Sequence, residues 1–239
     1  MRLGLGDQLM AFDGQGSQWR GTITRVGARR VVIRLDEPLH RPQSGLSLWL
    51  APALLKADRF EWIVQKATEL GADVLSPLVT RHTVVRLSSE QAITRRQRWQ
   101  RIATESAKQC QRAIVPVIHP PQPLEAFLRS QPRCAATLPR QRGECRLGRQ
   151  AEHPAEEDSL ILIPTLSVTT VPLQEVLGAA PRAGRQVVAL IGPEGDFSPE
   201  EVALAEKFGA RPVSLGPLTL RAETAAIALL AILKHVLDP

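Results

Sequence analysis

Residues 187–228 read VVALIGPEGDFSPEEVALAEKFGARPVSLGPLTLRAETAAIA, and this stretch decides how the chain folds. Residues 187–191 are a short apolar run of strand length. The Gly-Pro-Glu-Gly sequence at 192–195 interrupts the run and indicates a tight loop. A helix is expected next, because Ser198 can cap free backbone N–H groups and Glu201, three residues later, completes a capping box.

The second half of this stretch repeats the same order of elements. Residues 212–215 predict another short strand, Gly216-Pro217 breaks it, and a helix is expected from Ala222. Two loops therefore follow the carboxyl ends of two strands, where open α/β sheets bind ligands. Two ordinary strand–helix connections would have the same spacing, so both interpretations stay open on spacing alone.

Composition and length exclude several classes of protein. The chain has 239 residues, 44% of them hydrophobic, and a formal net charge of +6, which is compatible with an anionic partner. Its three cysteines form no C-x-x-C pair, and its five histidines show no metal-ligand spacing. No leader peptide is evident, and no apolar run approaches the roughly 18 residues of a membrane span. We expect a soluble cytoplasmic protein without a metal or a membrane anchor.

The two loop motifs are more specific together than either is alone. IGPEG followed by FS, and then LGPLTLRAETAA, closely resembles the C-terminal signature of the RsmE family. The resemblance continues upstream through RFEWIVQKATELG, SPLVTRH, RWQRIA and QCQR-x-x-VP, and covers most of the chain. Members of this family are SPOUT-class methyltransferases that methylate N3 of a uridine in 16S ribosomal RNA of the small subunit, with S-adenosylmethionine as cofactor.

The resemblance and the strand pattern together predict an α/β fold with two domains. Residues 44–239 are expected to form a SPOUT-type parallel sheet, and the resemblance adds a C-terminal trefoil knot. Residues 1–43 contain short, partly alternating strands with Gly-rich breaks, typical of a small β-barrel or meander. The family carries a PUA-like RNA-binding domain here, but this sequence resembles a point already inside it, so we expect a truncated barrel.

Elements between these regions follow from periodicity. Residues 58–70 have the spacing of an amphipathic helix that ends at Gly71, and residues 89–110 predict a long helix rich in Arg. Strands are expected at 46–50, 74–79, 115–118 and 159–163, with a short helix from Leu173. Residues 131–158 look like an inserted loop with one possible strand at 133–138.

The resemblance implies where the cofactor binds. In SPOUT enzymes it lies among three loops of the knot, where backbone groups can read the adenine edge and apolar side chains can enclose the ring. Carried over residue by residue, the predicted cofactor-binding residues are Thr165, Leu166, Leu190, Gly192, Glu194, Gly195, Leu215, Gly216, Leu218 and Leu220.

Methylation at N3 requires that the uridine lose a proton, so the site needs a base or a cation that stabilises the uridine anion. We assign Arg221 to stabilising that anion or a flanking phosphate, and Glu194 as a candidate proton acceptor. Glu223 is better explained as a carboxylate at a helix start. Two residues depart from the family pattern: Asp196 stands where Gly is usual, and Leu218 begins a pair that usually begins with Arg.

Five arginines are predicted to contact RNA. Arg25, Arg29 and Arg30 cluster near one turn, where either a solvated loop or phosphate contact would explain them. Arg81 follows a strand end, and Arg112 matches the family's Gln–Arg pair, although Gln111 stands where Gly is usual. The apolar stripe of the last helix predicts packing on the sheet, and the resemblance adds a homodimer interface.

Two other functions remain open. A ribose 2′-O-methyltransferase of the same class would have the same loops. A non-catalytic RNA- or ribosome-binding protein that kept the fold would account for the altered loop residues and the short N-terminal domain. A phosphate-binding nucleotide enzyme is disfavoured, because GPEG lacks the Lys and Ser/Thr of a phosphate loop.

Overall fold

The computed structural model describes residues 3–39, 45–131, 159–166, 170–178 and 186–238. The predicted domain boundary after residue 43 lies outside these residues, as does nearly all of the predicted insertion at 131–158 with its possible strand. Among the described residues, no helix is both long and apolar enough to cross a membrane.

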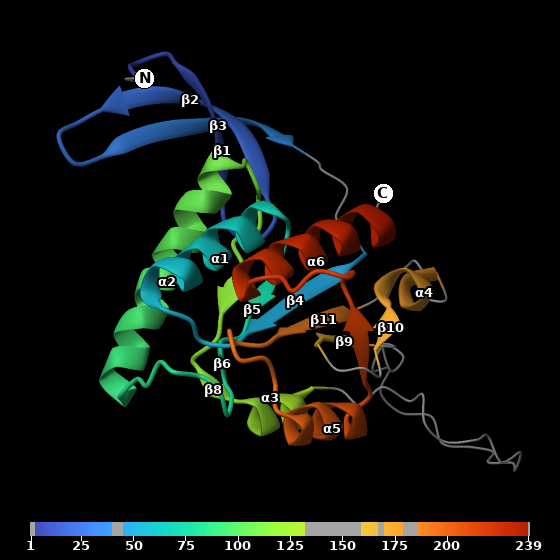
Figure 1. Ribbon diagram of the computed structural model, residues 1–239. Helices are drawn as coiled ribbons and strands as arrows, with labels where there is room; N and C mark the ends of the chain where they lie inside the picture. The colour runs from blue at the N-terminus through green and yellow to red at the C-terminus, as the bar shows by residue number, and fades with distance from the viewer. Residues whose placement is uncertain (1–2, 40–44, 132–158, 167–169, 179–185, 239) are drawn as a thin grey trace, which may run out of the picture.

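The N-terminal part is a three-stranded antiparallel sheet in the order β1-β2-β3, formed by β1 (Gln8–Phe12), β2 (Gln18–Val26) and β3 (Val31–Leu39). This confirms the predicted meander. Three strands leave the sheet with two open edges, so the described residues do not close a barrel. In Figure 1 this sheet stands at one end of the molecule, and its β2–β3 hairpin extends past the helices below it.

The rest of the chain is built on a parallel sheet that has seven strands among the described residues, in the order β10-β12-β9-β11-β4-β5-β7. The strands of this sheet are β4 (Ser47–Pro52), β5 (Val74–Leu75), β7 (Val117–Ile118), β9 (Leu160–Pro164), β10 (Val171–Pro172), β11 (Gln186–Ile191) and β12 (Ala210–Ser214). All six neighbouring pairs are parallel. The predicted α/β class is confirmed; the knot concerns how the chain threads, which strand order does not test, and stays a prediction.

Helices cover both faces of this sheet (Figure 1). On one face lie α1 (Ala57–Glu69), α2 (Ser89–Gln109) and α6 (Ala222–Leu237), and on the other lie α3 (Leu124–Ser130) and α5 (Pro199–Lys207). The short helix α4 (Leu173–Gly178) packs into the same core as α1 and α6. Each fully buried Leu or Ile in these layers contributes roughly 1.5–3 kcal/mol of transfer free energy.

The local signals of the sequence explain most helix ends. Ser198 accepts a hydrogen bond from the backbone N–H of Glu201, and the Glu201 side chain accepts one from the Ser198 N–H, which is the predicted capping box. Helix α1 ends before Gly71, whose φ of 91° is left-handed. The stripe predicted on the last helix is confirmed, because Ala226, Leu229 and Leu230 are buried in the core with Leu233 and Leu237.

One predicted strand is wrong. Residues 74–79 form two separate strands, β5 and β6 (Leu78–Val79), with Ser76-Pro77 between them. Pro77 has no N–H to donate and ends the pairing of β5. Strand β6 then pairs in parallel with β8 (Gln122–Pro123), which the sequence did not predict.

Candidate functional site

The candidate site lies where three neighbouring strands end. Strands β12, β9 and β11 are adjacent in the sheet, so the loops after Pro164, Ile191 and Ser214 meet at one edge. A cavity of about 260 Å³ opens between them. This volume is just below the range for small-molecule pockets, roughly 300–1,000 Å³. The three loops predicted from the sequence therefore come together as expected.

Eight of the ten predicted cofactor residues line this cavity: Thr165, Leu166, Gly192, Glu194, Leu215, Gly216, Leu218 and Leu220. The other two do not. Leu190 is fully buried in the core beneath the loop, and Gly195 lies against His82, whose Cβ would be 3.2 Å from a Cβ added at Gly195. Leu190 and Gly195 therefore support the loop after β11 from the side away from the cavity.

The sequence reasoning missed several lining residues at the strand ends. Pro164, Ile191, Val213 and Ser214 line the cavity, as do Pro193, Asp196, Thr219, Ala222 and Ala225. Some of them could have been predicted from their position, because the last residue of each strand borders the loop that follows it. The sequence marks Asp196 as a departure from the family pattern but does not predict that it lines the cavity.

The loop after β12 lines the cavity with Leu218, Thr219 and Leu220. No backbone group of Leu218, Thr219 or Leu220 makes a hydrogen bond to any described residue. Leu218 and Leu166 are also unusually exposed for leucines, at 75% and 65%. Unpaired N–H and C=O groups beside apolar side chains suit a ligand with a flat ring and polar edges, such as an adenosine.

The loop after β11 is held in a fixed shape. A Cβ added at Gly192 would lie 3.1 Å from Asp196 Oδ1 and 3.2 Å from the backbone N of Phe197, so only glycine fits there without a shift. The carboxylate of Glu194 lies 2.7 Å from the guanidinium of Arg59 on α1. Both partners of this ion pair are partly exposed, at 36% for Arg59 and 47% for Glu194, so the pair adds little stability.

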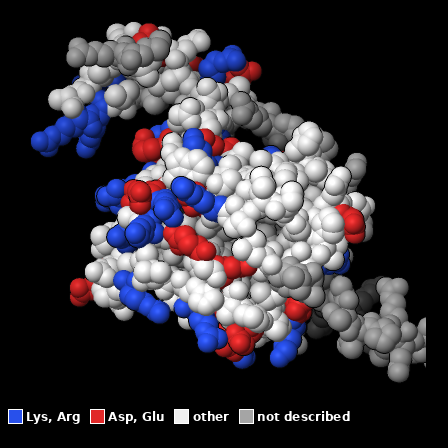
Figure 2. Space-filling model, viewed as in Figure 1, with Lys and Arg blue, Asp and Glu red and all other residues white. Residues whose placement is uncertain are grey.

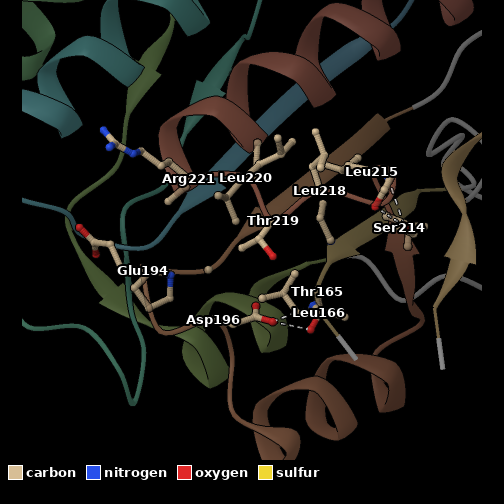
Figure 3. Close-up of a pocket in the computed structure, with 18 residues that line it drawn as sticks. Thr165, Leu166, Glu194, Asp196, Ser214, Leu215, Leu218, Thr219, Leu220 and Arg221 are labelled. Carbon is tan, nitrogen blue, oxygen red and sulfur yellow. Dashed lines mark hydrogen bonds between the residues drawn. The ribbon is translucent and has the colours of Figure 1, made fainter. Parts of the chain in front are cut away.

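Arg221 borders the cavity from the start of α6 and is the N-cap residue of that helix. Its guanidinium forms no ion pair or hydrogen bond with the residues that the structure describes. Figure 3 shows Arg221 and Glu194 on the same side of the cavity, at the opposite end from Ser214 and Leu215. A cation and a carboxylate thus lie toward the same side of the opening.

The five predicted RNA-binding arginines fall into three groups. Arg25, Arg29 and Arg30 are exposed at the free end of the β2–β3 hairpin and have no carboxylate partner among the described residues. Arg81 forms an exposed ion pair with Glu200 at 3.0 Å. Arg112 is mostly buried, with its guanidinium 2.6 Å from the carboxylate of Asp73. Of these five, only the hairpin arginines are both exposed and without a carboxylate partner among the described residues.

Basic side chains are spread over the face of the molecule that Figure 2 shows, and some of them gather at two places. Figure 2 shows Lys and Arg side chains extending from the free end of the hairpin, with an open space between them and the body below. Further basic side chains lie over α1 and α2, where acidic side chains are interspersed. Arg98, for example, pairs with Glu61 across these two helices at 2.7 Å.

Comparison with known proteins agrees with this geometry. The profile of the RNA methyltransferase domain family matches residues 42–234. Ribosomal RNA small subunit methyltransferase E from a Synechocystis species is 31% identical over 240 aligned residues, which cover all of this chain and 69% of that protein. The protein of that name from Bacillus subtilis is 26% identical, over 98% of this chain and 84% of that protein.

A solved structure extends the comparison to the fold. A protein from Legionella pneumophila that is proposed to be a methyltransferase was solved in complex with the bound cofactor SAM. It is 29% identical, with a TM-score of 0.77 over 98% of this chain and 84% of that one. Three loops meeting at a cavity, a family profile over most of the chain and full-length relatives all agree. The chain belongs to the RNA methyltransferase domain family and, within it, to the RsmE group of ribosomal RNA small subunit methyltransferases.

Proposed function

We propose that this protein transfers the methyl group of S-adenosylmethionine to N3 of a uridine in 16S ribosomal RNA of the small subunit. The observation that carries the proposal is the cavity between the loops after β9, β11 and β12, in a chain whose relatives are small-subunit ribosomal RNA methyltransferases. S-adenosylmethionine supplies a methyl group on a sulfonium, so the protein has to supply placement and electrostatics.

The chain's own residues suit this cofactor. Leu166, Leu215 and Leu218 offer apolar surface for the adenine ring. The backbone groups of residues 218–220, which have no hydrogen-bond partner among the described residues, can bond to its edges. Gly192 and Gly216 leave room for a ligand to approach the backbone closely. The predicted contacts are completed by Thr165, Glu194 and Leu220. The loop after β11 is supported by Leu190 and Gly195, which do not line the cavity.

Arg221 is the residue to which we assign charge stabilisation. Removing the proton from uridine N3 leaves an anion spread over the base, and a guanidinium at the cavity edge favours that form. Its lack of partners within the described residues leaves its hydrogen-bond donors free for the base or a flanking phosphate. Glu194, on the same side of the cavity, is the candidate proton acceptor, with Arg59 fixing the position of its carboxylate.

The N-terminal sheet is proposed to grip RNA through phosphate contacts. Arg25, Arg29 and Arg30 have no carboxylate partner among the described residues and can pair with phosphates. Arg81 lies outside this sheet, after β6, and can exchange its exposed partner Glu200 for a phosphate. Arg112 is different, because its guanidinium is used inside the protein, so we assign it the role of joining structural elements rather than contacting RNA. Residues 1–43 would then act as the RNA-binding domain and residues 44–239 as the methyltransferase domain.

A homodimer in the cytoplasm is the proposed working form. Two large apolar side chains on adjacent helices are partly exposed, Trp62 on α1 at 42% and Ile232 on α6 at 39%. Burial of such residues against a second copy would explain their exposure. Light scattering at micromolar concentration should give the mass of two chains, and a single-chain mass would contradict the dimer.

The reaction itself can be tested on small ribosomal subunits prepared from a strain that lacks this methylation. The subunits are incubated with the protein and S-adenosylmethionine carrying a deuterated methyl group, and the RNA is digested to nucleosides for mass spectrometry. We expect heavy 3-methyluridine. Heavy label in a ribose 2′-O-methylated nucleoside would establish the rival chemistry, and no label despite cofactor binding would favour a non-catalytic protein.

A further inference from the structure

Asp196 has a backbone conformation that most residues avoid. Its φ is +58°, in the left-handed region that glycine adopts freely and that Asp and Asn adopt more readily than other side chains. The resemblance to the RsmE family places a glycine at this position. The chain therefore keeps the glycine-type backbone but adds a carboxylate, which lines the candidate cofactor cavity.

The carboxylate of Asp196 joins two of the three loops. Its Oδ2 accepts hydrogen bonds from the Thr165 hydroxyl and from the backbone N–H of Leu166, both at 2.8 Å. Its Oδ1 accepts the backbone N–H of Phe197 at 2.8 Å. Figure 3 shows the Asp196 side chain directed toward Thr165 and Leu166 across the cavity floor. The loop after β9 is thereby tied to the loop after β11.

A third segment is attached at the same point. The Nδ1 atom of His82 lies 2.9 Å from the carbonyl oxygen of Gly195 and 3.0 Å from that of Asp196. Because carbonyl oxygens only accept, Nδ1 carries the proton and donates to them. His82 follows β6 in the chain, so residue 196 connects the ends of β6, β9 and β11. A glycine at 196 would keep the carbonyl contact and lose the carboxylate contacts.

We infer that Asp196 is a positioning residue for the cofactor site, holding Thr165 and Leu166 in the conformation that S-adenosylmethionine requires. The inference rests on the proposed function, since it takes the cavity as the cofactor site. We call the hydrogen bonds from Thr165 and Leu166 to the Asp196 carboxylate the clasp. Hydrogen bonds to a carboxylate are stronger than neutral ones, so the clasp orders the loop after β9 before the ligand binds. A binding site that is already in its binding conformation has a lower Kd than one in which only a fraction of the molecules has that conformation.

The decisive variant is Asp196→Gly, which suits the left-handed backbone and removes the carboxylate together with its hydrogen bonds with Thr165, Leu166 and Phe197. Loss of charge-assisted hydrogen bonds predicts that the Kd for S-adenosylmethionine rises about tenfold by calorimetry. Asp196→Asn keeps one acceptor oxygen and should fall between wild type and Asp196→Gly. The KM for the cofactor should rise with Kd, while kcat and the KM for small subunits stay within about twofold, because the clasp acts on cofactor binding.

Thr165, which donates a hydrogen bond to Asp196, offers a matched pair of variants. Thr165→Val removes the hydroxyl at nearly constant shape and should weaken cofactor binding, whereas Thr165→Ser keeps the donor and should restore it. In an Asp196→Gly background, Thr165→Val should weaken binding by less than it does in wild type, because the hydrogen bond that joins the two side chains is already gone. Gln111→Gly is the control for the backbone change, since Gln111 also has a φ of 58° but lies at the end of α2, away from the cavity.

A second measurement needs no cofactor. The backbone N–H of Leu166 should exchange with solvent faster in Asp196→Gly than in wild type, as followed by NMR. Cofactor binding by Asp196→Gly that equals wild type, or an unchanged exchange rate at Leu166, would overturn the inference. A wild-type protein that neither binds nor methylates would instead overturn the proposed function, and the Leu166 exchange rate would then decide the clasp alone.

Discussion

The guanidinium of Arg112 lies 2.6 Å from the carboxylate of Asp73 and also donates to the carbonyl oxygens of Thr68 and Ala72. The arginine side chain is only 16% exposed. Burial lowers the pKa of Arg112 and raises the pKa of Asp73, and their mutual attraction offsets part of that cost. The pair joins the C-terminal ends of α1 and α2 next to the start of β5.

Arg112→Ala should therefore affect stability and leave RNA binding intact. Removing one member of a mostly buried pair leaves the other charge without its partner, and we expect the free energy of unfolding to fall by about 3 kcal/mol. Denaturant unfolding measures this loss. Arg112→Lys should recover only part of it, because an ammonium cannot reach three acceptors in the geometry of a guanidinium. A folded Arg112→Ala protein with greatly reduced RNA affinity would contradict this assignment.

The hairpin arginines should show the opposite behaviour. Replacing Arg25, Arg29 and Arg30 together by Ala should leave unfolding unchanged and weaken RNA binding. If each contacts one phosphate, the slope of log K against log salt concentration should become shallower by about 2. Arg20→Ala is the matched control, because Arg20 lies on the same sheet and is paired with Glu37 at 3.1 Å. An equal salt slope in the triple variant and the control would exclude phosphate contact by the hairpin.

Arg221→Ala tests the chemical step. Loss of a group that stabilises developing negative charge should lower kcat by about 100-fold or more. Unfolding should be unaffected, since the side chain has no partner among the described residues. Arg211→Ala on β12 is the control for loss of an exposed arginine. Full turnover by Arg221→Ala would show that the assigned role is wrong.

His119 predicts how stability depends on pH. Burial, followed by the positive charge of Arg96, lowers the pKa of His119 below 6.5, and Ser76 Oγ lies 2.9 Å from its Nδ1. The unfolded chain then binds a proton at a higher pH than the folded protein does. This contribution is fully present above about pH 6.5 and is lost as the pH falls through the lower folded value.

Thermal unfolding on the two sides of that range checks this expectation. Between about pH 7.5 and about pH 5.5, which bracket the ordinary histidine value, wild type should lose more stability than His119→Gln. The comparison isolates His119, because the other titrating groups are shared by both proteins. Equal losses would mean that His119 is protonated as easily in the folded protein as in the unfolded chain.

Much of the fold could be predicted from local chemistry. The capping box at Ser198 and Glu201, the left-handed Gly71 after α1 and the apolar periodicity of α6 all specify elements within a few residues of the sequence. The break of β5 at Pro77 and the pairing of β6 with β8 could not be predicted in this way. Strand pairing depends on segments about 40 residues apart, which no local pattern records.

The parts of the candidate site that are formed by backbone loops could be predicted from the sequence. Glycines and apolar residues at strand ends marked the three loops, whereas interactions between distant side chains were missed. Arg112 carries the same sequence signal whether it pairs with Asp73 or with a phosphate. Asp196 and Gln111 stand where the family has glycine, and both have a φ of 58°. Glycine adopts this conformation freely, and only the structure shows which hydrogen bonds the Asp196 carboxylate makes there.

The most direct test of the account is a calorimetric titration of S-adenosylmethionine into wild type and into Leu218→Glu. Leu218 lines the cavity and is 75% exposed, so a carboxylate there should spare folding while replacing the apolar surface proposed to face the adenine. If the cavity holds the cofactor, wild type should bind it saturably and Leu218→Glu should bind it about tenfold or more weakly, the value of one well-placed apolar contact. Equal binding by the two proteins, or none by wild type with RNA present, would contradict the claim that the three-loop cavity is the cofactor site.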